Sequence, residues 1–382
     1  MSQSVPVSLS APAANLSVSE LVEAEGLKQQ LEERLTAVLA EQRGQLTTIS
    51  SDSDLLIDAW APMLMGGKRL RAAFAYWAWR AYGGQAQAAN RSGVIQVCAA
   101  LEMFQAAALF HDDVMDRSDT RRGIPTAHRS FAQTHLDEKL HGDADQYGLS
   151  AAILLGDLSL IASENEFRAG AATFPAAQGF EAHKHFDAMR TVVTVGQFLD
   201  VHAQVAQWEE DLTGAEARSL TVIETKTASY SVNSPLQIGA SLAGAPAVEH
   251  EKLRDFGIPV GMAYQLVDDL LGIFGDPEVT GKPAGDDLRE GKRTVLVIEA
   301  LRALAPQDRA TLQDSLGMSD LTDDQVTNLI ALIKSSGAVQ ATQRRIDELT
   351  TQGLNALASL NINQPGREFL EQLTALALRR KF

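Results

Sequence analysis

Cysteine is almost absent from this sequence of 382 residues, since Cys98 is the only one. A single cysteine excludes a disulfide framework and a metal site built from several thiolates, and it favours a reducing, cytoplasmic location. The first residues, MSQSVPVSLSAPAANLS, lack a basic segment followed by an apolar one, so they do not predict a signal peptide. Because no run of about 18 consecutive apolar residues occurs, we expect no transmembrane helix and no integral membrane protein.

Basic residues are also few. Lysine and arginine together number 33, against 49 aspartates and glutamates, which gives a formal net charge of −16. Such an acidic excess argues against nucleic acid or an anionic membrane as the main partner. It does not exclude a small anionic ligand, because a few local cations or metal ions can reverse the field inside one cleft.

Strand patterns are missing as well, whereas apolar residues recur at intervals of three and four along most of the chain. Residues 1–17 are rich in Ser, Ala and Pro and predict a disordered tail. Residues 18–382 predict one all-α domain, a large helical bundle around a central apolar cavity. Helices are expected within 21–39, 70–82, 94–110, 151–162, 189–203, 219–242, 253–274, 294–304, 326–336 and 366–378. Two polar segments, 132–148 and 275–294, are expected to be long loops.

Two groups of acids each follow an apolar run. After the run 94–110, Asp112, Asp113 and Asp116 fall on one side of a helix at about 100° per residue. Like charges this close repel one another unless divalent cations neutralise them, and carboxylate oxygens suit Mg²⁺. A second pair, Asp268 and Asp269, follows the run 257–267. The two acid clusters predict facing helices that hold Mg²⁺ between them.

Basic residues accompany both acid clusters: Lys68, Arg71, Arg121, Arg122, Lys226, Lys282 and Lys292. The segment GGKRLR begins a helix, where backbone N–H groups and basic side chains together suit an anion. Lys226 lies inside an apolar helix, where an unpaired charge is costly to bury. Each of these residues alone is more often a surface charge, but together they predict a cleft that binds diphosphates.

As an ordered set, the motifs resemble those of the trans-prenyltransferases, the isoprenyl diphosphate synthases. The matching segments are GGKRLR at 66–71, LFHDDVMDRSDTRRGIPTAH at 109–128, GD at 156–157, GQFLD at 196–200, KT at 226–227, YQLVDD at 264–269 and GKPAGDDLREGKRT at 281–294. The resemblance runs from about residue 55 to the C-terminus. It implies an all-α enzyme, usually a homodimer, that adds isopentenyl diphosphate to an allylic diphosphate.

The resemblance also implies a role for each matching residue. Metal ligands would be Asp112, Asp116 and Asp268, supported by Asp113 and Asp269, with two or three Mg²⁺ per site. The allylic diphosphate would be held by Arg121, Lys226 and Lys282. Isopentenyl diphosphate would be held by Lys68, Arg71, Gln105 and Arg122. Thr227 and Gln265 would turn their dipoles toward a carbocation, while Gln197, counted with the substrate-binding residues, and Asp200 would support the site.

Among the departures from the family pattern, Gly272 stands where a third acid is usual in the second cluster. We expect Gly272→Asp to leave catalysis intact and to lower the Mg²⁺ requirement. The missing acid leaves open a catalytically silent subunit that binds prenyl diphosphates. A terpene cyclase is a further alternative, but it has no second diphosphate site, so Lys68, Arg71 and Arg122 argue against it.

The residues before Asp112 bear on product length. Ala108, Phe104 and Leu101 lie on the side of the helix below Asp112. Small residues at Ala107 and Ala108 leave the upper pocket open, and Phe104 lies ~12 Å below Asp112 at ~1.5 Å per residue. We therefore expect a product of twenty carbons, geranylgeranyl diphosphate. The alternatives are fifteen carbons, twenty-five or more, and a pocket floor that comes from another helix.

Overall fold

The computed structural model describes residues 23–208, 211–275, 284–318 and 320–378. In chain order its helices are α2 (Leu27–Thr47), α3 (Asp54–Leu64), α4 (Leu70–Ala81), α5 (Arg91–Met115), α6 (Ala127–Asp137), α7 (Ala144–Ala171), α8 (Ala176–Val205), α9 (Thr213–Val222), α10 (Ser234–Leu242), α11 (Ala247–Phe274), α13 (Asp286–Arg289), α14 (Val295–Ala303), α15 (Pro306–Ser315), α16 (Asp323–Ser335), α17 (Ala338–Ser359) and α18 (Gln364–Leu378). A π-helix, η3 (Ile223–Asn233), joins α9 to α10, and 3-10 turns η1 (Ala24–Gly26) and η2 (Ser51–Ser53) precede α2 and α3.

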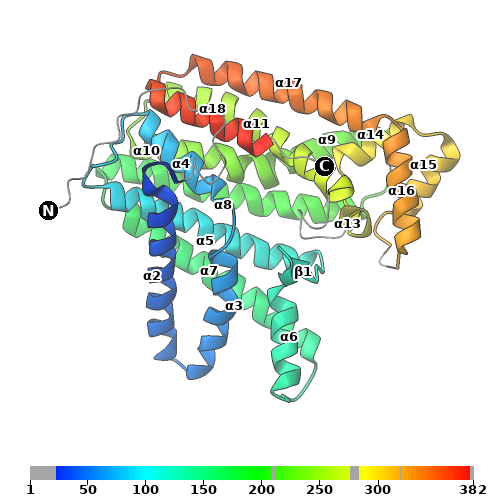
Figure 1. Cartoon of the computed structure of the whole chain (residues 1–382), viewed down its shortest axis with the longest axis horizontal. Helices are drawn as coiled ribbons and strands as arrows, with labels where there is room; N and C mark the ends of the chain where they lie inside the picture. Colours follow the sequence, from blue (N-terminus) through cyan, green and yellow to red (C-terminus); the bar gives the residue numbers. More distant parts are fainter. Residues whose placement is uncertain (1–22, 209–210, 276–283, 319, 379–382) are drawn as a thin grey trace.

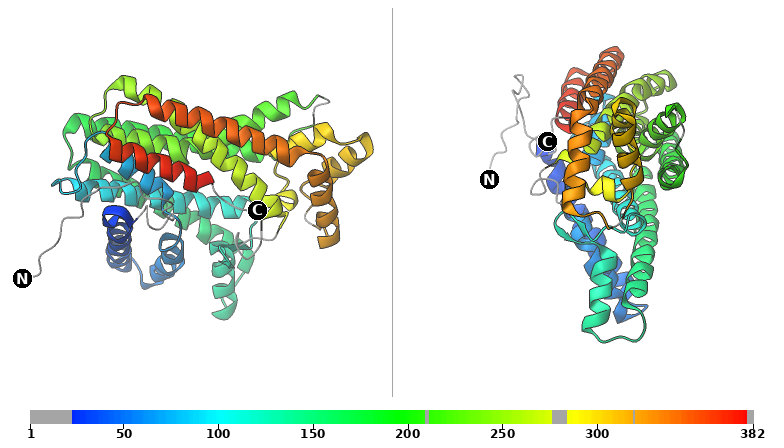
Figure 2. Two further views of the ribbon diagram at one scale, coloured as in Figure 1. Left: turned by 45° about the horizontal axis from the view of Figure 1, so that its top comes forward. Right: turned by 90° about the vertical axis from the view of Figure 1, so that its right-hand side faces the viewer.

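The all-α expectation is confirmed (Figure 1). Within the described residues, strand pairing is limited to β1 (Thr120–Arg121) and β2 (Ile124–Pro125), which form a small antiparallel hairpin after α5. The long helices lie side by side in the body of the molecule, while α2, α3 and α6 project from one side of it (Figures 1 and 2).

The inner helices are α5 and α11. Most of α5 from Gly93 to Ala107 is buried, which its nearly continuous apolar sequence requires. α11 belongs to two apolar clusters: Phe256 packs with the larger one around α4 and α5, and Leu270 with the smaller one around α14 and α16. The single domain at 18–382 stays a prediction, and the shared helix α11 favours it.

Two described helices, α5 and α7, have the length and hydropathy of a membrane-spanning helix, although the sequence pattern predicted none. The earlier expectation required an unbroken apolar run, whereas both helices contain scattered polar residues. Of the most apolar 18-residue window of α5, 78% is buried inside the fold, as in a core helix. In α7 only 39% of that window is buried, so this helix presents apolar side chains on its outer face.

Both expected long loops are wrong in part. In the segment 132–148, α6 continues to Asp137 and α7 begins at Ala144, where the side chain of Asp143 accepts a hydrogen bond from Gln146 N at 2.9 Å. The segment is polar because this helical hairpin projects into solvent, not because it is irregular. The segment 275–294 contains the short helix α13. Residues 276–283, with Lys282, and the expected tail at 1–17 lie outside the described residues.

Candidate active site

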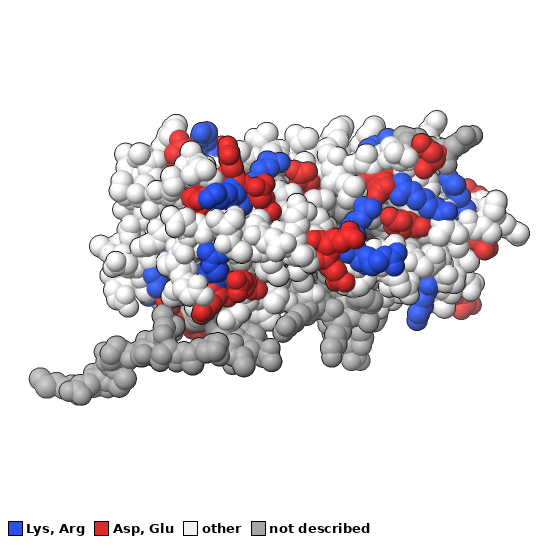
Figure 3. Space-filling model, turned by 90° about the horizontal axis from the view of Figure 1, so that it is seen from above, with Lys and Arg blue, Asp and Glu red and all other residues white. Residues whose placement is uncertain are grey.

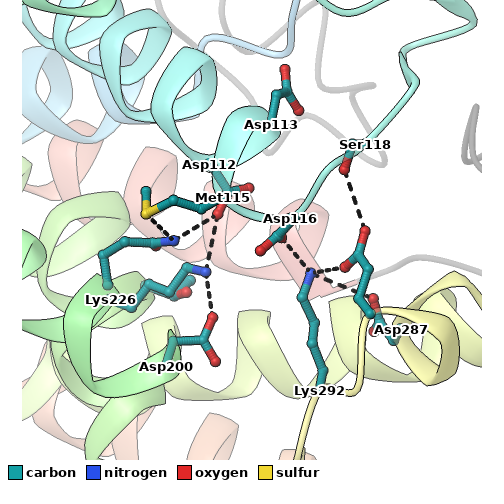
Figure 4. Close-up of polar contacts among 12 residues, drawn as sticks. Asp112, Asp113, Met115, Asp116, Ser118, Asp200, Lys226, Asp287 and Lys292 are labelled. Atoms are coloured by element: carbon teal, nitrogen blue, oxygen red, sulfur yellow. Dashed lines mark hydrogen bonds and ion pairs between the residues drawn. The ribbon is translucent and has the colours of Figure 1, made fainter. Parts of the chain in front are cut away.

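The first acid cluster lies at the C-terminal end of α5, where the helix leaves the core. Gln197 Nε2 of α8 and Lys226 Nζ of η3 donate to Asp112 Oδ1, at 3.1 and 3.2 Å. Arg121 Nη2, from the hairpin, donates to Asp112 Oδ2 at 3.2 Å. Side chains from α8, η3 and the hairpin therefore meet at Asp112, and Figure 4 shows the contact with Lys226.

The three acids of this cluster do not share one direction. Asp113 points away from Asp112 and Asp116 (Figure 4), and its Oδ1 accepts a hydrogen bond from Arg121 Nε at 2.6 Å. The expectation of three carboxylates facing one side is therefore wrong for Asp113. Helical periodicity places a Cβ, but a cation beyond the helix end determines where the carboxylate turns.

Asp116 contacts a lysine that the sequence interpretation left in a loop. Lys292 Nζ lies 3.2 Å from Asp116 Oδ2, 2.5 Å from Glu290 Oε2 and 3.7 Å from Asp287 Oδ1. Ser118 Oγ adds a hydrogen bond to Glu290 Oε1 at 3.3 Å, so the segment around α13 is tied to the first acid cluster (Figure 4).

The cations determine the protonation of this cluster. Burial by itself would raise the pKa of Asp112, but the charges of Lys226, Lys292 and Arg121 outweigh it and hold this pKa below its usual value. Burial raises the pKa of Asp116 to about 6, since Lys292 offsets only part of the effect and the charge of Asp112 adds to it. Asp112 is therefore charged at neutral pH, while Asp116 titrates close below it.

The second acid cluster faces the same space from the last turns of α11. Asp268 and Asp269 both line the cavity, and Asp269 is buried. Gln265 links two of the predicted residues, because its Oε1 accepts from Thr227 Oγ1 and its Nε2 donates to Asp269 Oδ1, both at 2.7 Å. Burial raises the pKa of Asp269 well above its usual value. Its Oδ2 has no hydrogen-bond partner among the described residues.

Lys226 and Thr227 lie on the π-helix, which the continuous apolar pattern 219–242 did not predict. Glycines on both neighbouring helices let η3 approach closely: a Cβ on Gly196 of α8 would lie 2.5 Å from Lys226 N, and one on Gly261 of α11 2.5 Å from Ala228 Cα. Asp200 then neutralises Lys226, with Oδ2 at 2.6 Å from Nζ. A wide helical turn at a functional residue is typical of π-helices.

The basic segment at the start of α4 forms the opposite wall. Arg71 Nη2 donates to Ser231 Oγ at 2.8 Å, and its guanidinium lies 4.2 Å from the centre of the Tyr230 ring. Arg69 is buried, and its Nη1 donates to Glu102 Oε2 of α5 at 3.0 Å. The buried pair fixes Arg69, which lines the cavity together with its neighbours Lys68 and Arg71.

One cavity of about 810 Å³ brings most of the predicted residues together. Those that line it are Lys68, Arg71, Gln105, Asp112, Arg121, Arg122, Lys226, Thr227, Gln265, Asp268 and Asp269. Gln197, Asp113 and Asp116 are not among the residues that line it, and Lys282 lies outside the described residues. Sequence reasoning missed Asp287 as a site residue, and it counted Lys292 among the cations of the cleft without giving it a role of its own. Both belong to the matched segment 281–294, but a charge in an apparent loop could not be told from a surface charge.

A further group of side chains that could hold a metal lies outside the cavity and is distinct from the two acid clusters. Ligand atoms of Glu164, His183 and Asp187 lie within 4.8 Å of one another. Arg190 already neutralises this group, since its Nη1 lies 2.6 Å from Glu164 Oε2 and its Nη2 contacts Asp187. We interpret the group as an ion-pair cluster between α7 and α8.

Comparison with known proteins agrees with the site. The family described as Polyprenyl synthetase matches residues 54–333, a range that contains both acid clusters and the cations around them. The chain belongs to this family. It is 31% identical to the geranylgeranyl diphosphate synthase of Sulfolobus acidocaldarius over 75% of this chain and 79% of that protein. It is 28% identical to the octaprenyl diphosphate synthase of Escherichia coli over 82% of this chain and 86% of that protein.

Solved structures of polyprenyl synthetases share the fold. The geranylgeranyl pyrophosphate synthase of Corynebacterium glutamicum, complexed with isoprenyl diphosphate and magnesium, superposes with a TM-score of 0.88 at 33% identity, over 96% of this chain and all of that one. The chain is therefore a prenyltransferase. The sequence identity of this chain to a relative named for a twenty-carbon product is close to its identity to one named for an octaprenyl product. Overall similarity therefore does not determine product length.

Proposed function

We propose that this prenyltransferase joins isopentenyl diphosphate to an allylic diphosphate with Mg²⁺ and releases geranylgeranyl diphosphate. The observation that carries the proposal is the cavity, in which acids of α5 and α11 face two separate groups of cations. Arg121 and Lys226 lie beside the first acid cluster, whereas Lys68 and Arg71 lie at the start of α4. Chain elongation requires sites for two diphosphates, and a cyclase requires one.

Mg²⁺ would be held by Asp112, Asp116 and Asp268, with two or three ions as in the family. The residues fit this ion, because the donors are all carboxylate oxygens and Asp269 has a buried oxygen with no hydrogen-bond partner among the described residues. Bound Mg²⁺ would neutralise charge on the departing diphosphate. Asp113 would serve the site by holding Arg121 in place.

The allylic diphosphate would lie between Arg121 and Lys226, with Lys292 as a further cation from the α13 side and Lys282 beyond the described residues. Asp200 keeps Lys226 charged and directed at the cavity. Thr227 and Gln265 would face the allylic carbon with their dipoles. The apolar walls of the bundle would exclude water from the carbocation, and the released diphosphate would accept the proton that is lost.

Isopentenyl diphosphate would bind Lys68, Arg71, Gln105 and Arg122. Burial and the positive charges of Arg121, Arg69 and Arg71 lower the pKa of Arg122. These crowded guanidinium groups repel one another, and an anion between them would relieve that repulsion.

Product length would be limited by an aromatic group below the first acid cluster. Phe104 is buried and meets Phe186 and Tyr230 edge-on, with ring centres 6.2 and 6.3 Å away. Phe186 in turn stacks on Phe167 at 4.2 Å. This packed aromatic group on α5, α7, α8 and η3 would form the floor of the product pocket and stop elongation after twenty carbons.

The proposal is tested with purified protein, radiolabelled isopentenyl diphosphate, an allylic primer of ten or fifteen carbons and Mg²⁺. We expect incorporation of label and a product that elutes with geranylgeranyl diphosphate on reversed-phase chromatography. Products of another length would overturn the assignment of chain length. No incorporation with any primer would favour a silent subunit that binds prenyl diphosphates.

We also propose a homodimer that forms through α7 and α8. Leu154 and Ile161 on α7 are 62% and 60% exposed, and Phe198 and Val205 on α8 are 64% and 78% exposed. Each pair is seven residues apart, so each forms an apolar stripe along its helix. By contrast, the face in Figure 3 carries acidic and basic side chains in mixed groups.

Light scattering after gel filtration tests the dimer. Wild type should have twice the mass of the chain, and Phe198→Glu should shift it toward the monomer. Ile49→Glu is the matched control, because Ile49 is 81% exposed but lies on the connection between α2 and α3. A monomeric wild type, or equal effects of both variants, would contradict the proposal.

A further inference from the structure

The space beside Gly272 is not empty. A Cβ on Gly272 would lie 2.1 Å from Asp287 Oδ2 and 2.6 Å from its Cγ. Real Cβ atoms do not approach other atoms this closely, so the carboxylate of Asp287 occupies the volume that a side chain at position 272 would need. The second acid cluster thus has a third carboxylate at this position, supplied by α13 rather than by α11.

Backbone contacts hold Asp287 in this place. Gly285 N donates to Gly272 O at 3.1 Å, which joins the start of α13 to the last turn of α11. Gly285 has φ +74°, a conformation that favours glycine, and the chain turns there into α13. Lys292 N donates to Asp287 O at 2.9 Å and closes the other end of this segment.

The carboxylate of Asp287 also faces the reacting space. Asp287 lines the same cavity as Asp268 and Gly272. Lys292 Nζ lies 3.7 Å from Asp287 Oδ1 and 3.2 Å from Asp116 Oδ2, so one ammonium group lies between Asp287 and the first acid cluster (Figure 4).

We propose that Asp287 is the third carboxylate of the second acid cluster, acting on the Mg²⁺ side of the cavity in place of the acid that Gly272 lacks. This inference rests on the proposed Mg²⁺ dependence. It reverses the expectation that Gly272→Asp would leave catalysis intact, because a side chain at position 272 would have to displace the carboxylate of Asp287. Gly272 and Asp287 are complementary, because the absence of a side chain at position 272 leaves room for the Asp287 carboxylate. Either α11 or α13 can therefore supply the acid.

The test is a reciprocal exchange, followed by two readouts. Adding Mg²⁺ in the presence of inorganic diphosphate should raise the melting temperature of the protein. The first readout is the Mg²⁺ concentration that gives half of this increase. The second is the Mg²⁺ concentration for half-maximal turnover. Asp287→Asn should raise both about tenfold, the lower end of what loss of a carboxylate near a metal typically costs. Gly272→Asp alone should impair both. Gly272→Asp with Asp287→Ala should return both to within about threefold of wild type.

Three controls make each outcome decisive. Asp286→Asn removes the same charge from the neighbouring residue of α13, and an effect equal to that of Asp287→Asn would show a general field and overturn the inference. In a Lys292→Met background, Asp287→Asn should still raise the Mg²⁺ requirement; no further change would mean that Asp287 only positions Lys292. A double exchange no better than Asp287→Ala would also overturn it.

Asp112→Asn separates this inference from the proposed function. If Asp112→Asn raises the Mg²⁺ requirement and Asp287→Asn does not, only the role of Asp287 is wrong. If neither variant changes the response to Mg²⁺ and diphosphate, the proposed Mg²⁺ site itself is wrong. Melting temperatures without Mg²⁺ show that each variant is folded, and the isosteric Asp287→Asn keeps the packing against Gly272.

Discussion

At the scale of single residues, Asp112 is where the contacts of the site converge. Its two oxygens meet Gln197, Lys226 and Arg121, which come from α8, η3 and the hairpin. The sequence presents Asp112 as one of several acids that repel one another. In the fold, the surrounding cations outweigh that repulsion and lower its pKa. Its removal therefore affects both the metal site and two buried cations.

Asp112→Asn should lower turnover more than tenfold, which corresponds to a barrier raised by more than about 1.4 kcal/mol. It should also lower the free energy of unfolding by about 1 kcal/mol, because Lys226 and Arg121 each lose a charged partner. Steady-state rates and urea unfolding measure the two effects. Asp119→Asn is the control, since Asp119 is an exposed acid that pairs with Arg129. A variant that keeps more than a tenth of wild-type activity would refute the metal assignment.

Arg122→Ala should raise the KM for isopentenyl diphosphate at least tenfold and change the KM for the allylic primer little, because a charge-assisted phosphate contact is lost in one subsite. It should not lower the melting temperature of the free enzyme, since the guanidinium groups that depress the pKa of Arg122 repel it. Kinetics with each substrate varied in turn test this prediction. Equal increases in both KM values would show that Arg121 and Arg122 were assigned to the wrong diphosphates.

At the scale of elements, the start of α4 depends on α5. Arg69 has φ +57°, which is unfavourable for a residue with a side chain, and the buried ion pair with Glu102 holds it there. Glu102 Oε1 also accepts from Ala72 N at 3.4 Å, so a residue of α5 satisfies a free N–H in the first turn of α4. Lys68 and Arg71, on either side of Arg69, are positioned by this contact.

Glu102→Gln should lower the free energy of unfolding by about 3 kcal/mol, because it leaves the charge of Arg69 buried without its partner. It should raise the KM for isopentenyl diphosphate more than that for the primer. Replacing both residues by Met should restore much of the stability but not the KM. Denaturant unfolding of Arg69→Met, Glu102→Met and the double variant measures the coupling. Coupling as small as that of the exposed pair Arg129–Asp119, at most about 1 kcal/mol, would contradict the prediction.

The side of α5 below Asp112 should determine product length. Phe104→Ala should lengthen the product beyond twenty carbons, because it opens the floor formed with Phe186 and Tyr230. Ala108→Phe should stop elongation at fifteen carbons, since it fills the space one turn below Asp112. Product chromatography measures both changes. If neither variant alters the product distribution, the floor comes from another helix.

At the scale of the whole molecule, two stacked histidines join α8 to α11 far from the acid clusters. The rings of His185 and His250 lie 4.9 Å apart, and His250 Nδ1 contacts Gln237 Oε1 of α10. Along α8 and α11 this contact lies ~22–27 Å from Asp200 and Asp268, at ~1.5 Å per residue. Burial and the charge of His250 lower the pKa of His185 to about 4, from a usual value of 6.5.

Stability should therefore fall as the pH decreases from 6.5 toward 4. In this range the unfolded chain binds a proton at His185 that the folded chain does not, so acidification favours unfolding. His185→Gln should lose less melting temperature than wild type between pH 7 and pH 4.5, while turnover at pH 7 stays unchanged. Equal losses in both proteins would show that other groups, such as buried carboxylates, account for the acid sensitivity.

The sequence alone determined the fold class and most of the site. Apolar periodicity is a property of near neighbours along the chain, so it predicted α4 closely and most of α5. It located α8 and α11 as well, but it missed the first thirteen residues of α8 and the first six of α11. The acidic and basic motifs, together with the family resemblance that they carry, named eleven residues that line one cavity. Polarity was misleading in α6, because a helix that projects into solvent needs few apolar residues.

Only the tertiary structure decided how these residues face one another. Asp113 contacts Arg121, and Lys292 contacts the first acid cluster. The π-helix that carries Lys226 packs closely against glycines of α8 and α11. Position 272 is the clearest case, since the sequence shows a missing acid and the fold places Asp287 in its space. The physical reason is that sequence periodicity describes only residues within a turn or two of one another along the chain. These contacts depend instead on how α11 packs against a segment that follows it.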